Sequence, residues 1–113
     1  MKFVNVIIAL FTLTAYFHSS AFAADEVETI EVRIKDHVFD KSEVKVKAGQ
    51  KFKFVVYNDD AQVEEFESKK LGVEKMVKGK SSLTLKLGPL KPGKYDFVGE
   101  FHEQSAKGTL IVE

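Results

Sequence analysis

The chain has 113 residues, enough for one domain, and its 17 Lys and Arg residues balance 17 Asp and Glu residues. A net charge near zero argues against a general attraction to nucleic acid or to an anionic membrane surface. The chain contains no Cys. Disulfides, a blue-copper centre with its thiolate ligand and a structural zinc site built on thiolates are therefore excluded.

The first 23 residues have the layout of an export signal. Met1-Lys2 gives a short positive start, residues 3–17 are mostly apolar, and Ala21-Phe22-Ala23 forms a small-residue cleavage pattern. A membrane anchor is the alternative, but the apolar run is shorter than the ~20 residues that a spanning helix needs. We predict a signal peptide over residues 1–23, a periplasmic location and no membrane insertion after cleavage.

The rest of the chain shows short alternating patterns, in which apolar side chains occupy every second position. Residues 51–58 become apolar on both faces at Val55 and Val56, which is typical of a central, buried strand. Turns rich in Gly, Pro, Asn and Asp separate the patterns, and no helical period of useful length appears. We predict an all-β, antiparallel β-sandwich of about seven strands. The expected strands cover residues 29–35, 43–47, 51–58, 62–68, 83–87, 94–98 and 107–113.

Three segments break the alternating rule, namely residues 36–40, 63–68 and 99–103. In a sandwich of this size, functional side chains are expected on the loops at the ends of the strands, not at strand centres. Most other charged residues alternate with apolar ones and are assigned to the solvated face. The three segments are therefore the candidates for a site.

The second segment holds three acids around one aromatic residue. If it is extended, Glu65 and Glu67 share one face, while Phe66 shares the other with Glu64 and packs inward. Clustered carboxylates repel one another, and a bound cation would remove that cost. The alternative, which the spacing alone favours, is a solvated acidic edge strand that discourages pairing with other chains.

The third segment places a carboxylate beside an imidazole. If the strand continues past Gly99, Glu100 and His102 leave the same face, because a strand alternates faces with a period of two. Such a pair would form half of a metal site, and the alternative is an exposed His beside an ordinary Glu. His37 is assigned to a loop, with only a minor claim as a ligand, and Met76 is assigned to apolar packing.

Three stretches resemble the cupredoxin family, the Greek-key sandwiches that carry copper in small periplasmic electron-transfer proteins. They are residues 39–49, residues 54–58, in which an Asn ends the strand before the first ligand loop, and residues 90–97 followed by 107–112. The resemblance covers nearly all of residues 28–113. It implies a single cupredoxin-like Greek-key β-sandwich domain over that range.

The departures from the family pattern fall on its copper ligands. The position of the first His is taken by Glu64 or Glu65, Gly99 follows the strand where the family has its Cys, and Ala106 stands where an axial Met is common. Only His102 matches a conventional ligand. Since a blue-copper site depends on the bond between copper and thiolate, we do not expect one here.

A narrower resemblance involves residues 64–68, 88–93 and 99–102. These are similar to small cupredoxin-like periplasmic proteins associated with bacterial iron-uptake systems. The resemblance implies an iron or copper ion as the ligand and an inner-membrane iron permease as the partner. It also implies help with ferrous-iron oxidation or delivery, more as a binding protein than as an enzyme. The polar positions carried over as metal ligands are Glu64, Glu65, Glu67, Glu100 and His102.

The resulting hypothesis is one cation bridged between two segments. Glu65 and Glu67 would supply one side and Glu100 and His102 the other, a set suited to iron, Cu(II) or Mn(II) but not to Cu(I). The hypothesis requires the two segments to meet at one end of the sandwich. A metal-free module that docks a basic surface of a periplasmic partner is the alternative. Residues expected to support the ligands or to replace one of them are Glu64 and Glu103.

Overall fold

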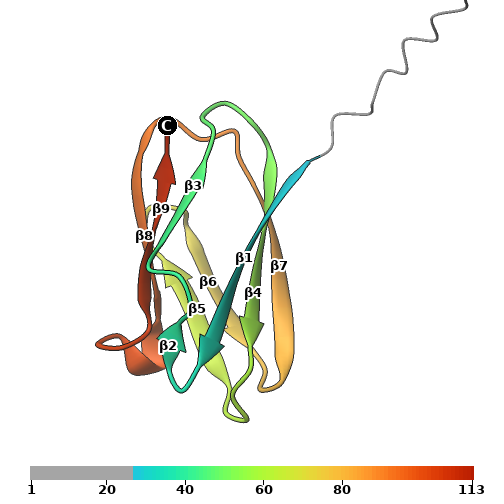
Figure 1. Ribbon diagram of the computed structural model, residues 1–113, viewed down its shortest axis with the longest axis vertical. Coiled ribbons are helices and arrows are strands. Elements are labelled where there is room, and N and C mark those ends of the chain that lie inside the picture. The colour runs from blue at the N-terminus through green and yellow to red at the C-terminus, as the bar shows by residue number, and fades with distance from the viewer. Residues whose placement is uncertain (1–26) are drawn as a thin grey trace, which may run out of the picture.

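The computed structural model describes residues 27–113, which form a sandwich of two β-sheets (Figure 1). The predicted signal peptide over residues 1–23 lies outside the described residues. The described elements are nine strands and one short 3₁₀ helix: β1 (Glu28–Lys35), β2 (Val38–Phe39), β3 (Glu43–Val46), β4 (Phe52–Asn58), β5 (Glu64–Ser68), β6 (Val73–Val77), β7 (Ser81–Leu87), β8 (Gly93–Gly99), η1 (Glu100–His102) and β9 (Lys107–Val112). No helix within this range is long and apolar enough to cross a membrane.

The predicted all-β sandwich is confirmed, but its purely antiparallel pairing is wrong. One sheet has the order β2-β1-β4-β7 and the other the order β3-β9-β8-β5-β6. The pairs β1–β4 and β3–β9 are parallel, and the other pairs are antiparallel. Parallel neighbours need a long crossover connection. Alternation along one strand carries no information about such a connection.

The strands follow the burial patterns expected from the sequence. In β1, Ile30, Val32 and Ile34 are buried and the residues between them are exposed. The predicted central strand is β4, which pairs with β1 on one side and β7 on the other. The prediction missed β2 and β6. The first has only two residues, and the second buries Val77 alone, so neither carries a period-two signal.

Four aromatic side chains form the centre of the core between the sheets. The Phe97 ring lies 5.0 Å from that of Phe39, with the planes nearly perpendicular, and 5.5 Å from each of the rings of Phe54 and Phe66. Spacings in this range are typical of favourable aromatic pairs. A Cβ on Gly108 would lie 2.5 Å from Phe97 Cζ, so the glycine leaves the space that this ring occupies.

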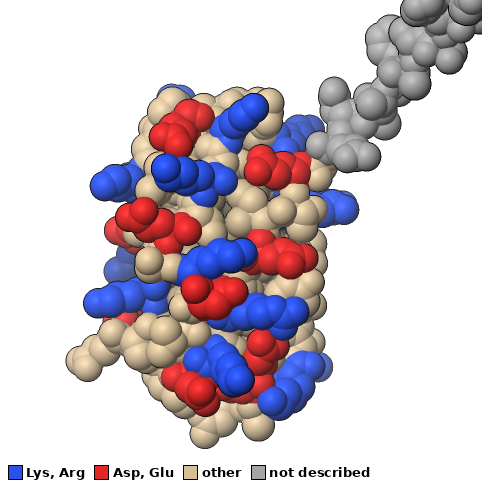
Figure 2. Space-filling model, viewed as in Figure 1, with Lys and Arg blue, Asp and Glu red and all other residues tan. Residues whose placement is uncertain are grey.

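One end of the sandwich collects three of its connections. The β1–β2 turn, the β4–β5 loop and η1 lie at the end opposite to the C-terminus (Figure 1). Elsewhere, basic and acidic side chains intermingle across the face seen in Figure 2, as expected for solvated strand faces in a chain of balanced charge. The connections therefore bring segments far apart in sequence to one end, where side chains could form a site.

The aromatic core predicts a large difference between two phenylalanines. Phe97 is 1% exposed and Phe101 is 48% exposed. Phe97→Ala is expected to lower the free energy of unfolding by about 3–5 kcal/mol because it leaves a cavity among the other rings. Phe101→Ala should change it by less than about 0.5 kcal/mol. Denaturant unfolding of both variants beside the wild type measures this, and equal losses would contradict the assigned core.

Candidate metal site

The carboxylate of Glu64 lies at the centre of the candidate site, although it is buried. Its side chain is 3% exposed at the start of β5. Oε1 accepts the backbone N–H groups of Glu65, at 3.0 Å, and Phe101, at 2.9 Å, and Oε2 lies 2.7 Å from His102 Nδ1. A buried carboxylate needs such partners, because an unpaired charge away from water is very costly. These contacts join β5 to η1.

Gly99 permits this close approach. A Cβ at that position would lie 2.8 Å from Glu64 Cδ and 2.9 Å from the Ala106 Cβ. Both distances are shorter than real Cβ atoms tolerate. The glycine therefore lets the Glu64 side chain lie against the end of β8, directly before the helix that carries His102.

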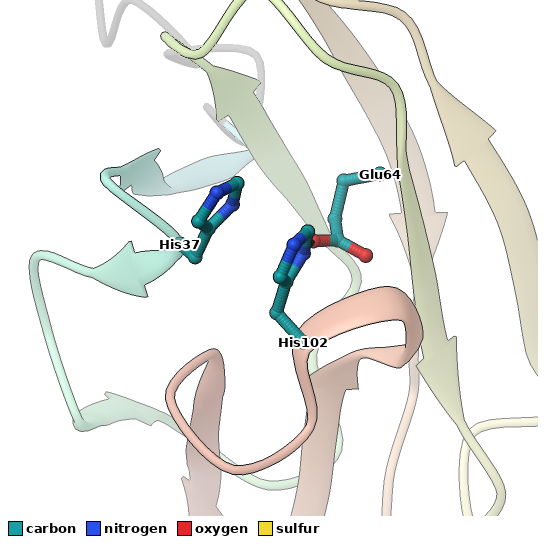
Figure 3. A group of neighbouring side chains, drawn as sticks. All are labelled: His37, Glu64 and His102. Carbon is teal, nitrogen blue, oxygen red and sulfur yellow. Dashed lines mark hydrogen bonds and ion pairs between the residues drawn. The ribbon is translucent and has the colours of Figure 1, made fainter.

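His37 reaches the same place from the other sheet. It lies in the turn between β1 and β2, and its ring stacks on that of His102 with the centroids 3.6 Å apart and the planes 14° from parallel. Figure 3 shows the two rings side by side next to the Glu64 carboxylate. One ligand atom from each of the three residues lies within 4.8 Å of the other two. Imidazole and carboxylate groups together could hold a first-row transition-metal ion.

Asp60 holds the turn that carries His37. Its carboxylate accepts the backbone N–H groups of Asp36, at 2.8 Å, and His37, at 3.0 Å. Partial burial alone would raise the pKa of Asp60, but these two donors and the nearby charges of His37 and Lys80 outweigh it, so the pKa lies below its usual value. Asp60 therefore faces His37 as a carboxylate.

The predicted ligands are divided between two places. Glu64 and His102 are in direct contact, so the prediction that the acidic segment and the segment with His102 meet at one end is confirmed. Phe66 packs inward on the same face as Glu64, also as predicted. Glu65 and Glu67, however, lie on the opposite face of β5.

The expectation that Glu100 and His102 share a face is wrong. The strand ends at Gly99 and the chain continues as the 3₁₀ helix η1. With three residues per turn, positions two apart in such a helix point in directions about 120° apart. His102 therefore turns toward Glu64, while Glu100 joins the acids on the outer face.

The outer carboxylates form two overlapping groups, which share Glu100. Ligand atoms of Glu65, Glu74 and Glu100 lie within 4.8 Å of one another, as do those of Glu67, Glu100 and Glu103. A surface cavity of about 340 Å³, lined by Glu67 and Glu103 and also by Lys69 and Lys70, opens beside them. Cation binding by these residues stays a prediction; they are Glu64, Glu65, Glu67, Glu100 and His102.

The surroundings of two of these acids raise their pKa values. The pKa of Glu65 is raised to about 7, first by a hydrogen bond shared with Glu74, then by burial and by Glu100. The pKa of Glu100 is also raised, mainly by burial and by Glu67. Within this group, Glu65 can therefore keep a proton at a higher pH than an ordinary glutamate and share it with Glu74.

Comparison with known proteins identifies the family. The family model of the cupredoxin-like domain matches residues 6–112. This chain belongs to the cupredoxin-like domain family. This chain is 41% identical over 88 residues to protein RP394 of Rickettsia prowazekii (strain Madrid E). The matched residues cover 78% of this chain and 70% of RP394.

Solved structures share the fold at low sequence identity. One is the metal binding domain of the Cu(I)-exporting P-type ATPase CopA of Streptococcus pneumoniae D39, solved with Cu(I), with a TM-score of 0.64 and 11% identity over 75% of this chain and 84% of that one. Another is amicyanin from Paracoccus versutus, with a TM-score of 0.60 and 21% identity over 75% of this chain and 81% of that one. At these identities the likeness shows the fold alone.

His37 is the member of the site that the sequence prediction undervalued. The Asp36-His37 pair fits a two-residue hairpin turn, because Ile34 and Phe39 on either side of it pair across β1 and β2. The pairing of β1 beside β4 then brings this turn next to Asp60. The hairpin could have been inferred from local spacing, but the neighbouring strand could not.

The outer acids of the cupredoxin-like domain predict a pH dependence of stability. Because the pKa of Glu65 is higher in the folded chain, at about 7, than its usual 4.5, the folded state binds more protons between these values. Its contribution to stability is therefore present at low pH and is lost as the pH rises through about 7. Glu65→Gln should flatten the dependence of the melting temperature on pH in this window. At pH 8 the melting temperature of this variant should be higher than that of the wild type.

Glu43→Gln is the matched control, since Glu43 is an exposed strand residue remote from these acids in the fold. Thermal unfolding from pH 4.5 to pH 8 compares both variants with the wild type. An unchanged pH profile in Glu65→Gln would show that the outer carboxylates do not share protons.

Proposed function

We propose that this protein binds one divalent first-row metal ion, copper or iron, between His37, Glu64 and His102. The observation that carries the proposal is the convergence of these three side chains from the β1–β2 turn, β5 and η1, with ligand atoms within 4.8 Å of one another. Two imidazoles and a carboxylate suit Cu(II) and Fe(II). The chain has no Cys, so no thiolate could join this set.

The contact between Glu64 and His102 supports a ligand role for both. Their 2.7 Å separation is bridged by one proton, since a carboxylate oxygen can only accept and the imidazole nitrogen donates. A cation that replaced this proton would have an oxygen and a nitrogen already adjacent. Uptake of the metal would then release a proton, as is general when a ligand must lose one.

The wider role follows the resemblance to iron-uptake proteins. We propose an exported, periplasmic protein that works beside an inner-membrane iron permease and assists ferrous-iron oxidation or delivery. A carboxylate ligand favours the more highly charged state of a bound ion. A bound ferrous ion would therefore be easier to oxidise. The protein's own part is to position the three ligands. The solved CopA domain with Cu(I) and the amicyanins are compatible with a metal-binding use of the fold.

The alternative function is a metal-free interaction module. One observation favours it, namely the exposure of Val38 and Phe101, each about half exposed and each adjacent in sequence to a histidine of the site. In that case the contact between Glu64 and His102 would serve only to hold η1. Failure of the pure protein to take up any metal would favour this alternative.

The proposed site predicts a strong effect at one histidine. His102→Ala is expected to weaken binding of Cu(II) and of Fe(II) by at least about 100-fold, because even supporting residues of metal sites contribute about 10- to 100-fold. Calorimetric titration of the metal-free protein, with Fe(II) kept anaerobic, measures this. Gln104→Ala, an exposed residue of the same connection, is the control and should bind as the wild type does.

Glu100→Ala distinguishes the histidine site from the outer carboxylates. If the cation binds at His37, Glu64 and His102, this variant should change the affinity by less than about threefold, since Glu100 faces the other group. If Glu100→Ala lost metal binding while His102→Ala kept it, the site would lie on the outer face. Unchanged binding in both would remove the proposal.

A further inference from the structure

The turn that carries His37 has an unusual backbone. Asp36 and His37 are the two central residues of the β1–β2 hairpin, and their φ angles are 52° and 61°. Two consecutive left-handed residues are what this kind of tight hairpin requires, and Asn-Gly is the usual solution. Asp and His adopt positive φ angles more often than most residues other than Gly, but such angles remain uncommon for them. Contacts from outside the turn would therefore add to its stability.

Asp60 provides that stabilisation with both oxygens of one side chain. Oδ1 accepts the N–H of Asp36 at 2.8 Å, and Oδ2 accepts the N–H of His37 at 3.0 Å. The Asp60 side chain is 16% exposed, and its charge-assisted hydrogen bond to His37 is partly buried, while that to Asp36 is exposed. No other side chain among residues 27–113 is hydrogen-bonded to these two amides.

The same carboxylate also faces the imidazole. His37 Nδ1 lies 3.5 Å from Asp60 Oδ2, which is long for a hydrogen bond but close for a charge. A neighbouring carboxylate favours the form of the neutral ring that carries its proton on the nearer nitrogen. Nδ1 then holds the proton, and the lone pair that could bind a cation is on Nε2.

Asp60 is itself fixed from the core. Its backbone N–H donates to Asn58 Oδ1 at 3.1 Å. The Asn58 side chain is 1% exposed and donates to the carbonyls of Gln62, at 2.7 Å, and Val77, at 3.1 Å. A continuous set of hydrogen bonds thus runs from a buried amide to the exposed turn.

We infer that Asp60 is a positioning residue for His37, which holds the left-handed turn and makes Nε2, not Nδ1, the nitrogen that His37 offers to a cation. The part that concerns a cation rests on the proposed function. The choice of nitrogen in the metal-free protein does not.

The test reads the imidazole directly. Long-range ¹H–¹⁵N NMR of the metal-free protein, at alkaline pH where imidazole is neutral, shows which ring nitrogen of His37 carries the proton. We expect Nδ1–H in the wild type, and Nδ1–H retained after addition of Zn(II) as a diamagnetic probe. Asp60→Asn should shift the proton population toward Nε2 and weaken Zn(II) binding about tenfold.

Asp40→Asn is the matched control. Asp40 lies beyond β2 in the same hairpin and accepts the Arg33 backbone N–H at 2.8 Å, so its substitution removes the same charge without touching His37. It should leave both the proton position and the Zn(II) affinity unchanged. Circular dichroism of each variant reports whether the fold is kept, and the wild-type spectrum tests the inference even if Asp60→Asn does not fold.

The outcomes separate the two proposals. A proton on Nε2 in the metal-free wild type would overturn the inference. The inference would also be overturned if Asp60→Asn folded and kept the Zn(II) affinity and the proton position of the wild type. If the wild type binds neither Zn(II), Cu(II) nor Fe(II) but carries Nδ1–H, the proposed function fails while the positioning role of Asp60 stands.

Discussion

The end of this sandwich that carries the candidate site depends on one buried carboxylate. Glu64 has little access to water, yet its oxygens receive two backbone N–H groups and one imidazole nitrogen. Each donor comes from β5 or η1, so satisfying the charge and joining these elements are the same event. Loss of a donor would leave a buried charge short of partners, which costs more than the bond itself contributes. The position of His102 is therefore set by the solvation needs of Glu64.

A second carboxylate places the other imidazole by a different means. Asp60 binds backbone amides of the β1–β2 turn and fixes where the chain runs, while Glu64 contacts the His102 ring itself. The two histidines reach one another from opposite sheets, with their rings stacked at 3.6 Å. Without these anchors, a two-residue turn and a three-residue helix would be poor platforms for ligands. The carboxylates compensate for the small size of the elements that carry the histidines.

Sequence reasoning succeeded where the physical cause is local. Alternation along β1 and the apolar centre of β4 predicted their faces and their burial, because a strand repeats every two residues whatever its neighbours are. The same rule failed one residue beyond β8, since Gly99 ends the strand and η1 has a period of three. Glu100 and His102 were thus assigned to one face although they serve two different groups. The parallel pairing that brings His37 to Asp60 depends on crossovers, which leave no mark in local spacing.

The divided acids show why residue type alone was a poor guide to the site. Glu65, Glu67 and Glu100 are outward neighbours, and the pKa values of Glu65 and Glu100 are raised there, whereas Glu64 points inward and is paired with an imidazole. A cation on the outer face would meet only hard oxygen ligands and competition from shared protons. A cation bound by His37, Glu64 and His102 would meet two imidazole nitrogens and one carboxylate, with the His37 turn held by Asp60. Because no thiolate is present in the chain, any redox use of such an ion would rely on oxygen and nitrogen ligands. Among them, a carboxylate would favour the more highly charged form of the ion.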